Sequence, residues 1–267
     1  MYLVRRSDGV RIAVYEYGRR SRGHSILLVH GWPLDHRIFE YQLEPLLEQE
    51  YHIIAVDLRG FGASDRPGGG YTYDRMAMDL YEIVKFLELK KVNFIGFSMG
   101  AAIVLRYMRL FRGYRVKKML LIAAIAPQWE GPQGIDAAQV QVLRQLAKND
   151  RPNMAEYLIH TQFWAKPQSK ALENWLIQMA LSASGLATRH CLEALIQEDG
   201  KKDLNAVKVP VFLIQGDQDK MTPPSLGSLL QEKIEGAQLE FFKEAGHGIL
   251  YEQREILNQR LLEILSI

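Results

Sequence analysis

The feature that most constrains the fold of this chain is the pentapeptide at residues 96–100, Gly-Phe-Ser-Met-Gly, because of the segments on either side of it. Residues 92–95 form a short apolar run that predicts a buried strand, and residues 99–111 predict an apolar helix rich in small residues. A serine at so tight a strand-to-helix turn sits on a strained backbone, with its hydroxyl exposed above the sheet. Gly96 and Gly100 fit this turn because a Cβ at either position would collide with neighbouring backbone. We therefore predict Ser98 as a nucleophile.

The hydroxyl of Ser98 needs a base to take up its proton, and that base needs an acid to orient it. One apolar run ends just before Asp217 and Asp219, and a second ends a few residues before His247. Strand ends that lead into loops are the places where open α/β sheets bind their ligands. The chain order serine, aspartate, histidine is the order expected of a hydrolase with its serine on such a turn.

Apolar strands alternate with helices over most of the chain, which predicts an α/β fold with a mostly parallel sheet flanked by helices. Residues 7–9 predict a hairpin turn between the first two strands. We expect eight strands, at residues 2–5, 11–17, 25–30, 51–57, 92–95, 118–125, 211–215 and 239–243. The expected helices of this part lie at residues 37–48, 73–89, 99–111 and 251–265.

The alternation stops at Pro127, and residues 139–148, 154–163, 169–181 and 186–197 all have helical patterns. The pattern predicts a core formed by residues 1–126 and 206–267, with a helical cap, or lid, at residues 127–205. The aromatic residues of this insertion either hold it together or face the pocket that it covers. We expect some of them to face an apolar pocket, and we predict Trp32, Trp129, Trp164 and Ile249 as substrate-binding residues.

Two further segments carry a family resemblance that covers essentially the whole chain. Residues 30–33, His-Gly-Trp-Pro, resemble the loop after the third strand of α/β-hydrolase fold proteins, and residues 57–65 resemble the D-x-R-G-x-G-x-S segment of that family. Together with Gly-Phe-Ser-Met-Gly, these motifs are most similar to the cofactor-free haloperoxidase, perhydrolase and arylesterase branch. The resemblance implies that Ser98 is the nucleophile, Asp219 the acid and His247 the base, with the backbone N–H groups of Trp32 and Met99 as the oxyanion hole.

The family spacing favours Asp219 over Asp217 as the acid, and we expect Asp217 to shape the turn. We interpret His30 as a structural hydrogen-bonding residue and expect His36 at the surface. The remaining histidines show no ligand spacing, so we expect no metal. The resemblance implies no cofactor.

The composition agrees with a cytoplasmic enzyme that acts on a small molecule. The chain has 267 residues and a net charge of +2, which argues against nucleic acid as a partner. Cys191 is its single cysteine, so no intramolecular disulfide is possible and a reducing compartment is expected. The N-terminal residues lack the apolar stretch of a signal peptide, and no run approaches the length of a membrane span. The sequence leaves the oligomeric state open.

Three functions fit these features. The first is a serine hydrolase that cleaves small to medium apolar carboxylic esters or lactones through an acyl-enzyme. The second is a perhydrolase or cofactor-free haloperoxidase, which is suggested by Pro33 because its fixed φ would position a backbone carbonyl beside the peroxide. The third is a receptor that keeps the three catalytic residue types but binds a small molecule without turnover, since a fold does not by itself establish an activity.

Overall fold

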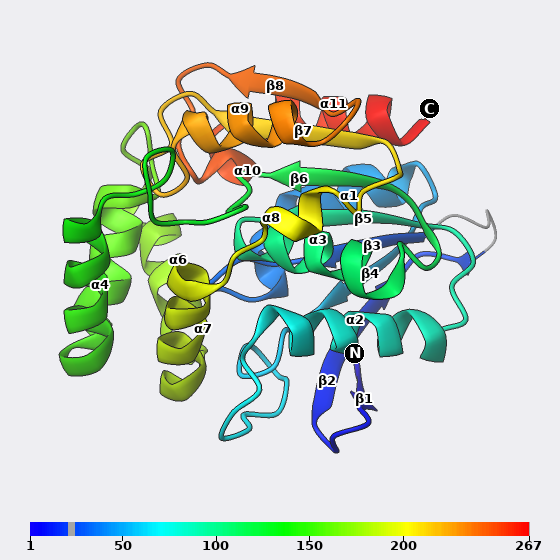
Figure 1. Ribbon diagram of the computed structural model, residues 1–267, viewed down its shortest axis with the longest axis horizontal. Helices are drawn as coiled ribbons and strands as arrows, with labels where there is room; N and C mark the ends of the chain where they lie inside the picture. The colour runs from blue at the N-terminus through cyan, green and yellow to red at the C-terminus, as the bar shows by residue number, and fades with distance from the viewer. Residues whose placement is uncertain (21–24, 267) are drawn as a thin grey trace.

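An eight-stranded sheet runs through the middle of the molecule (Figure 1). The computed structural model describes residues 1–20 and 25–266. The strands, in the order in which they lie side by side, are β1 (Tyr2–Arg5), β2 (Arg11–Tyr17), β4 (His52–Val56), β3 (Ser25–Val29), β5 (Val92–Phe97), β6 (Val116–Ile122), β7 (Val211–Gly216) and β8 (Gln238–Phe242). β2 pairs antiparallel with β1 and with β4, and all the other neighbouring strands are parallel. This confirms the predicted α/β fold, including the early hairpin.

Helices cover both faces of this sheet, which explains why the central strands are mostly apolar and buried along their whole length. Every residue of β3, β4, β5 and β7 is buried. Figure 1 shows α3 and α9 in front of the strands and α1 and α11 behind them. The helices of this part are η2 (His36–Phe39), α1 (Glu40–Glu48), α2 (Tyr73–Phe86), α3 (Met99–Phe111), α9 (Pro224–Lys233), α10 (Ile249–Glu252) and α11 (Arg254–Ser266). The expected C-terminal helix is therefore interrupted at Gln253, where the backbone leaves the helical region.

The segment between β6 and β7 contains the expected helices and lies at one end of the sheet, toward which the parallel strands point (Figure 1). We call residues 127–205 the helical insertion. Its helices are α4 (Ala137–Asn149), α5 (Arg151–Tyr157), η3 (Leu158–Gln162), α6 (Lys170–Ser182), α7 (Gly185–Gln197) and α8 (Lys201–Leu204). Asp136, Ser169 and Ser184 start α4, α6 and α7 by accepting a backbone N–H with their side chains. The carboxyl ends of the core strands thus face the insertion, as ligand sites of α/β sheets require.

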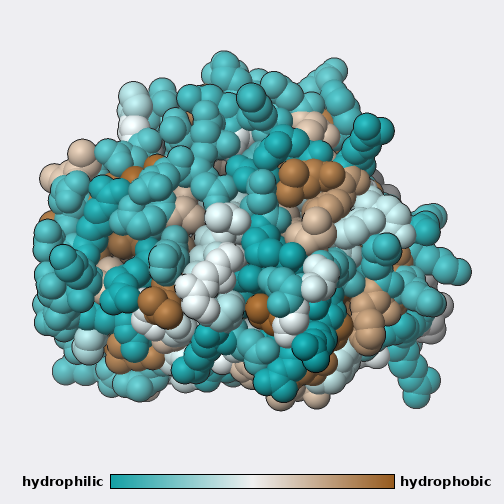
Figure 2. All heavy atoms as spheres, turned by 60° about the horizontal axis from the view of Figure 1, so that its bottom comes forward, coloured by the Kyte–Doolittle hydropathy of each residue, from teal (hydrophilic) through white to brown (hydrophobic). Residues whose placement is uncertain are grey.

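Figure 2 shows one face on which hydrophilic residues dominate and apolar residues form small separate groups. Among residues 1–20 and 25–266, none of the helices combines the length and the hydropathy that a membrane crossing requires.

Candidate active site

The turn between β5 and α3 has the strained geometry that the pentapeptide predicts. Ser98 adopts φ 55° and ψ −120°, outside the regions that L-residues favour. A Cβ on Gly96 would lie 2.7 Å from the Ala101 Cα, and one on Gly100 would lie 2.2 Å from the Val29 carbonyl oxygen. Only glycine allows α3 to approach β5 and β3 so closely. The side chain of Ser98 makes no capping bond to its own helix, which leaves its hydroxyl free for another partner.

The partner of the Ser98 hydroxyl is His247. The Nε2 atom of His247 lies 3.0 Å from Ser98 Oγ, and its Nδ1 atom lies 2.9 Å from Asp219 Oδ2. The three side chains come from the loops after β5, β7 and β8, so the parallel strands bring residues far apart in the sequence to one edge of the sheet. Asp217, by contrast, is exposed, and its N–H donates to the Phe242 carbonyl oxygen. The structure thus brings Asp219 to His247 and leaves Asp217 in the turn.

The Asp219 carboxylate is held by donors that the sequence analysis did not identify. Its Oδ1 accepts the N–H groups of Met221 and Thr222, both at 2.8 Å. Its Oδ2 accepts the Thr222 hydroxyl at 2.6 Å and the Gln215 amide at 3.1 Å, in addition to the His247 ring. These donors suit a carboxylate that carries its negative charge, because an ionised carboxylate only accepts hydrogen bonds. The one sequence signal for them is the Asp-x-x-Thr spacing, which favours a side chain that bonds the backbone two or three residues ahead.

The loop of the predicted oxyanion hole lies against Ser98. A Cβ on Gly31 would lie 2.7 Å from Ser98 Cβ, so the loop after β3 approaches the serine as closely as a glycine permits. Within residues 1–20 and 25–266, the backbone N–H groups of Trp32 and Met99 have no acceptor. Met99 is also the first residue of α3, where free N–H groups and the helix dipole attract negative charge. Both groups are thus available to an anion.

His30 holds this loop in place, as its interpretation as a structural residue requires. Its Nδ1 lies 2.9 Å from the Gly31 carbonyl oxygen, and its Nε2 accepts the Leu58 N–H at 2.9 Å. Burial lowers the pKa of His30, which favours the neutral ring that can donate at one nitrogen and accept at the other. His30 therefore fixes the carbonyl that precedes Trp32.

His36 is partly buried rather than at the surface, where we expected it to be. Its ring stacks on Tyr15 at 3.5 Å, and its Nδ1 lies 2.7 Å from Asp57 Oδ1. Burial alone would raise the pKa of Asp57, but the hydrogen bond and charge of His36, the charge of His30 and the Ala63 N–H together outweigh it and lower that pKa. Asp35, His36 and Asp57 bring possible metal-ligand atoms within 4.8 Å of one another. The oxygens of both carboxylates already accept hydrogen bonds, among them those from Arg37 to Asp35, which accounts for the group without an ion.

The predicted substrate-binding residues are all buried. Trp32 and Trp129 pack edge to face at 6.3 Å, and their indole N–H groups donate to the carbonyl oxygens of Thr188 and Met221. Ile249 is fully buried at the start of α10. Trp164 differs from the other two tryptophans because its indole N–H is buried without a partner in the described part of the chain.

The helical insertion closes over the candidate residues. Ser98 is 1% exposed and His247 is 0% exposed. Phe163, from the insertion, packs edge to face on His247 at 5.5 Å, and its carbonyl oxygen accepts the Gly248 N–H at 2.7 Å. A hollow beside Trp129 holds only about 10 Å³, about the space of a single water molecule. Ser98 and His247 are thus buried beneath the insertion in this structure.

Comparison with known proteins agrees with this architecture. The family described as alpha/beta hydrolase fold matches residues 24–253. The chain is 36% identical to the AB hydrolase superfamily protein YisY of Bacillus subtilis (strain 168), over 98% of each chain. It is 33% identical to an esterase from Exiguobacterium antarcticum, with a TM-score of 0.95 and 99% of each chain covered. A bromoperoxidase from Bacillus anthracis is 31% identical, with a TM-score of 0.92 and coverage of 97% of this chain and 96% of that one.

These matches define the class of protein. The chain belongs to the α/β-hydrolase fold family, as its motifs predict, and resembles both the esterases and the haloperoxidases of that family. Membership supports a hydrolase function.

Proposed function

We propose that this protein is a serine hydrolase that cleaves small to medium apolar carboxylic esters or lactones through an acyl-enzyme. The observation that carries the proposal is the continuous hydrogen-bonded line from the Ser98 hydroxyl through His247 to Asp219. The likeness to the Exiguobacterium antarcticum esterase supports the same reaction class.

The reaction follows from the charges that develop at the site. His247 Nε2 takes the proton of Ser98 Oγ as the oxygen attacks the ester carbonyl, and the imidazolium that forms is stabilised by Asp219. The carbonyl oxygen becomes an anion, which the N–H groups of Trp32 and Met99 bind; each such donor typically contributes about 3 to 4 kcal/mol to the transition state. His247 then protonates the leaving alcohol. In the second step His247 takes a proton from water as the water attacks the acyl-enzyme, and returns that proton to Ser98 Oγ as the acid product leaves.

We further propose that residues 1–126 and 206–267 are the catalytic core and that residues 127–205 are a cap that shapes the substrate pocket. Trp32, Trp129, Trp164 and Ile249 are the proposed apolar contacts of the substrate. Of the three tryptophans, Trp164 is the one whose N–H is free to bond a substrate oxygen, because it has no acceptor in the described chain. The apolar character of these side chains supports a substrate with an apolar acyl or alcohol group.

A panel of p-nitrophenyl esters of increasing chain length tests the proposal. We expect turnover by the wild-type protein, and we expect Ser98→Ala to lower kcat by about 10⁴ or more. Ser228→Ala removes an exposed hydroxyl on α9 and serves as the matched control, with unchanged kcat. Wild-type turnover in a folded Ser98→Ala variant would remove Ser98 from the mechanism. Slow, sub-stoichiometric release by the wild-type protein on every ester would instead favour a receptor.

A second activity is favoured by the likeness to the bromoperoxidase from Bacillus anthracis. In this reaction hydrogen peroxide, rather than water, would attack the acyl-enzyme, and the product would be a peracid. The experiment is a halogenation assay with acetate and hydrogen peroxide. A rate no higher than with peroxide alone, while ester hydrolysis persists, counts against this activity.

A further inference from the structure

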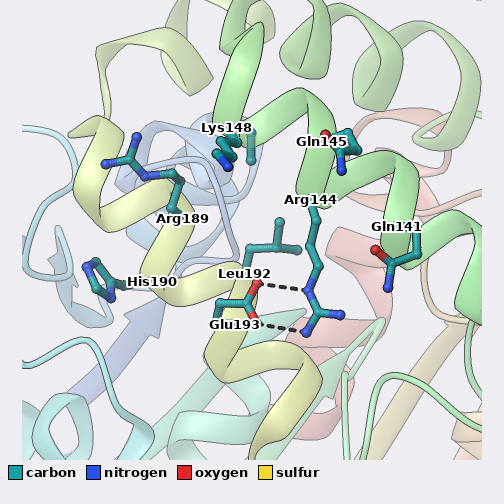
Figure 3. Close-up of a pocket in the computed structure, with 9 residues that line it drawn as sticks. Gln141, Arg144, Gln145, Lys148, Arg189, His190, Leu192 and Glu193 are labelled. Atoms are coloured by element: carbon teal, nitrogen blue, oxygen red, sulfur yellow. Dashed lines mark hydrogen bonds and ion pairs between the residues drawn. The ribbon is translucent and has the colours of Figure 1, made fainter.

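A groove of about 480 Å³ lies between α4 and α7 of the helical insertion, and it contains none of the candidate catalytic residues. A volume of this size is typical of small-molecule sites. Its floor is apolar, since Ala147 and Leu192 are buried between the two helices. Figure 3 shows the side chains that line it; the polar ones are Gln141, Arg144, Gln145, Lys148, Arg189, His190 and Glu193.

Charged side chains of both helices line this groove in two successive helical turns. In one turn, Arg144 of α4 donates to both carboxylate oxygens of Glu193 of α7, at 2.9 and 2.8 Å (Figure 3). Lys148 lies four residues after Arg144, and Arg189 lies four residues before Glu193, so each is one helical turn away on the same face. Figure 3 shows Lys148 and Arg189 at the same end of the groove.

The second turn therefore carries two cations where the first carries an ion pair. Both Lys148 and Arg189 are exposed, and neither has a hydrogen-bond or ion-pair partner among residues 1–20 and 25–266. Arg144 adds a third positive charge, which Glu193 balances. Two cations without a counter-charge make this end of the groove positive, and a positive surface attracts an anion.

We propose that the α4–α7 groove binds an organic anion with an apolar body. The anionic head lies between Lys148 and Arg189, where the cations have no counter-charge. The apolar body lies over Ala147 and Leu192, and the Arg144–Glu193 pair bounds the groove one helical turn away. The chemical class is an alkyl chain with a carboxylate or phosphate head. The site is separate from Ser98 and does not depend on the proposed ester hydrolysis.

Isothermal titration of octanoate into the whole protein tests this site. We expect saturable binding to the wild-type protein. In the double variant Lys148→Ala/Arg189→Ala the Kd should be at least tenfold higher, because both cations that bind the anionic head are lost. Lys170→Ala removes an exposed lysine on α6 and is the matched control, with unchanged Kd. All the changed side chains are exposed, so thermal melts of the variants should match that of the wild-type protein.

The probes separate the parts of the proposal. Octanol lacks the charge and inorganic phosphate lacks the apolar body, so each should bind more weakly than octanoate. Octyl phosphate against octanoate shows which head group is preferred, and tighter binding of either fits the site. The proposal is overturned if the wild-type protein does not bind millimolar octanoate or octyl phosphate, or if the double variant binds them as tightly as the wild-type protein. Repeating the titration with Ser98→Ala distinguishes the groove from the ester site, because the loss on changing Lys148 and Arg189 must persist in that background.

Discussion

At the scale of single residues, the carboxylate of the proposed acid, Asp219, depends on a neighbour three residues away. The Thr222 hydroxyl donates to Asp219 Oδ2 at 2.6 Å and lies 3.2 Å from His247 Nδ1. Thr222 is fully buried, so no water can replace its hydroxyl without a rearrangement. A hydrogen bond to a charged group contributes about 1.5 to 3 kcal/mol. Thr222 therefore acts through Asp219, as a positioning residue.

We expect Thr222→Val to lower kcat on a p-nitrophenyl ester about tenfold, which corresponds to ~1.4 kcal/mol of transition-state stabilisation. KM should change little, because Thr222 contacts Asp219 and not the proposed substrate contacts. Thr222→Ser keeps the hydroxyl and should restore most of the rate. Thr161→Val, at an exposed threonine of η3, is the control. Equal rates for the serine and valine variants would mean that the hydroxyl has no part in positioning Asp219.

At the scale of elements, one carboxylate joins the helical insertion to the loop of His247. Glu252, at the end of α10, accepts the N–H groups of Ala165 and Lys166 at 2.8 and 3.1 Å and the N–H of Gly246 at 2.7 Å. The chain on both sides of His247 is thus tied to the insertion, since Gly248 bonds the Phe163 carbonyl oxygen. The positions of the insertion and of His247, the proposed base, are therefore coupled.

Glu252→Ala should loosen both segments at once. We expect kcat/KM for the ester to fall by about tenfold or more, because loss of these charge-assisted bonds costs roughly 1.5 to 3 kcal/mol. Amide hydrogen exchange should become faster at both residues 163–166 and residues 245–248. Glu255→Ala, at an exposed position of the following helix, should change neither quantity. Faster exchange in only one of the two segments would contradict the coupling.

Strands β1, β2 and β4 meet at Glu16, whose carboxylate links them. It accepts from Tyr2, Arg20 and His52 at 2.7 to 2.8 Å. Partial burial raises the pKa of Glu16, but the hydrogen bonds from Arg20, Tyr2 and His52 outweigh it and lower the pKa from 4.5 to about 2. A depressed pKa means that the folded protein gains stability above the unfolded value, near 4.5, and loses it as the pH falls toward 2.

We expect Glu16→Gln to destabilise the protein at pH 7 by on the order of 1 kcal/mol, since solvent screens a partly exposed carboxylate. The difference in free energy of unfolding from the wild-type protein should shrink below pH 4.5 and vanish near pH 2. Denaturant unfolding across this range measures it, with Glu48→Gln, at an exposed glutamate of α1, as the control. A difference that stays constant with pH would contradict the assigned shift.

At the scale of the whole molecule, the sequence predicts the sheet and the three candidate residues for one physical reason. Each residue follows an apolar strand, and parallel strands end at the same edge. The roles of Thr222 and Glu252 could not be predicted, because their partners depend on how loops fold against one another. The hydrophobic pattern of a sequence carries no information on such loop contacts. The partial burial of His36 could not be predicted for the same reason. The groove between α4 and α7 could not be predicted either, because the helical pattern of each segment does not determine which faces of the two helices oppose each other.

The central claim is that Ser98 Oγ forms a covalent bond to the acyl group of the substrate, in a site that is buried in this structure. A fluorophosphonate forms a stable adduct with a serine only where a base and an oxyanion site activate it. Intact-mass analysis followed by peptide mapping should find one adduct per chain, on Ser98, and none in Ser98→Ala. An adduct on a different residue, or none while ester hydrolysis continues, would contradict the account.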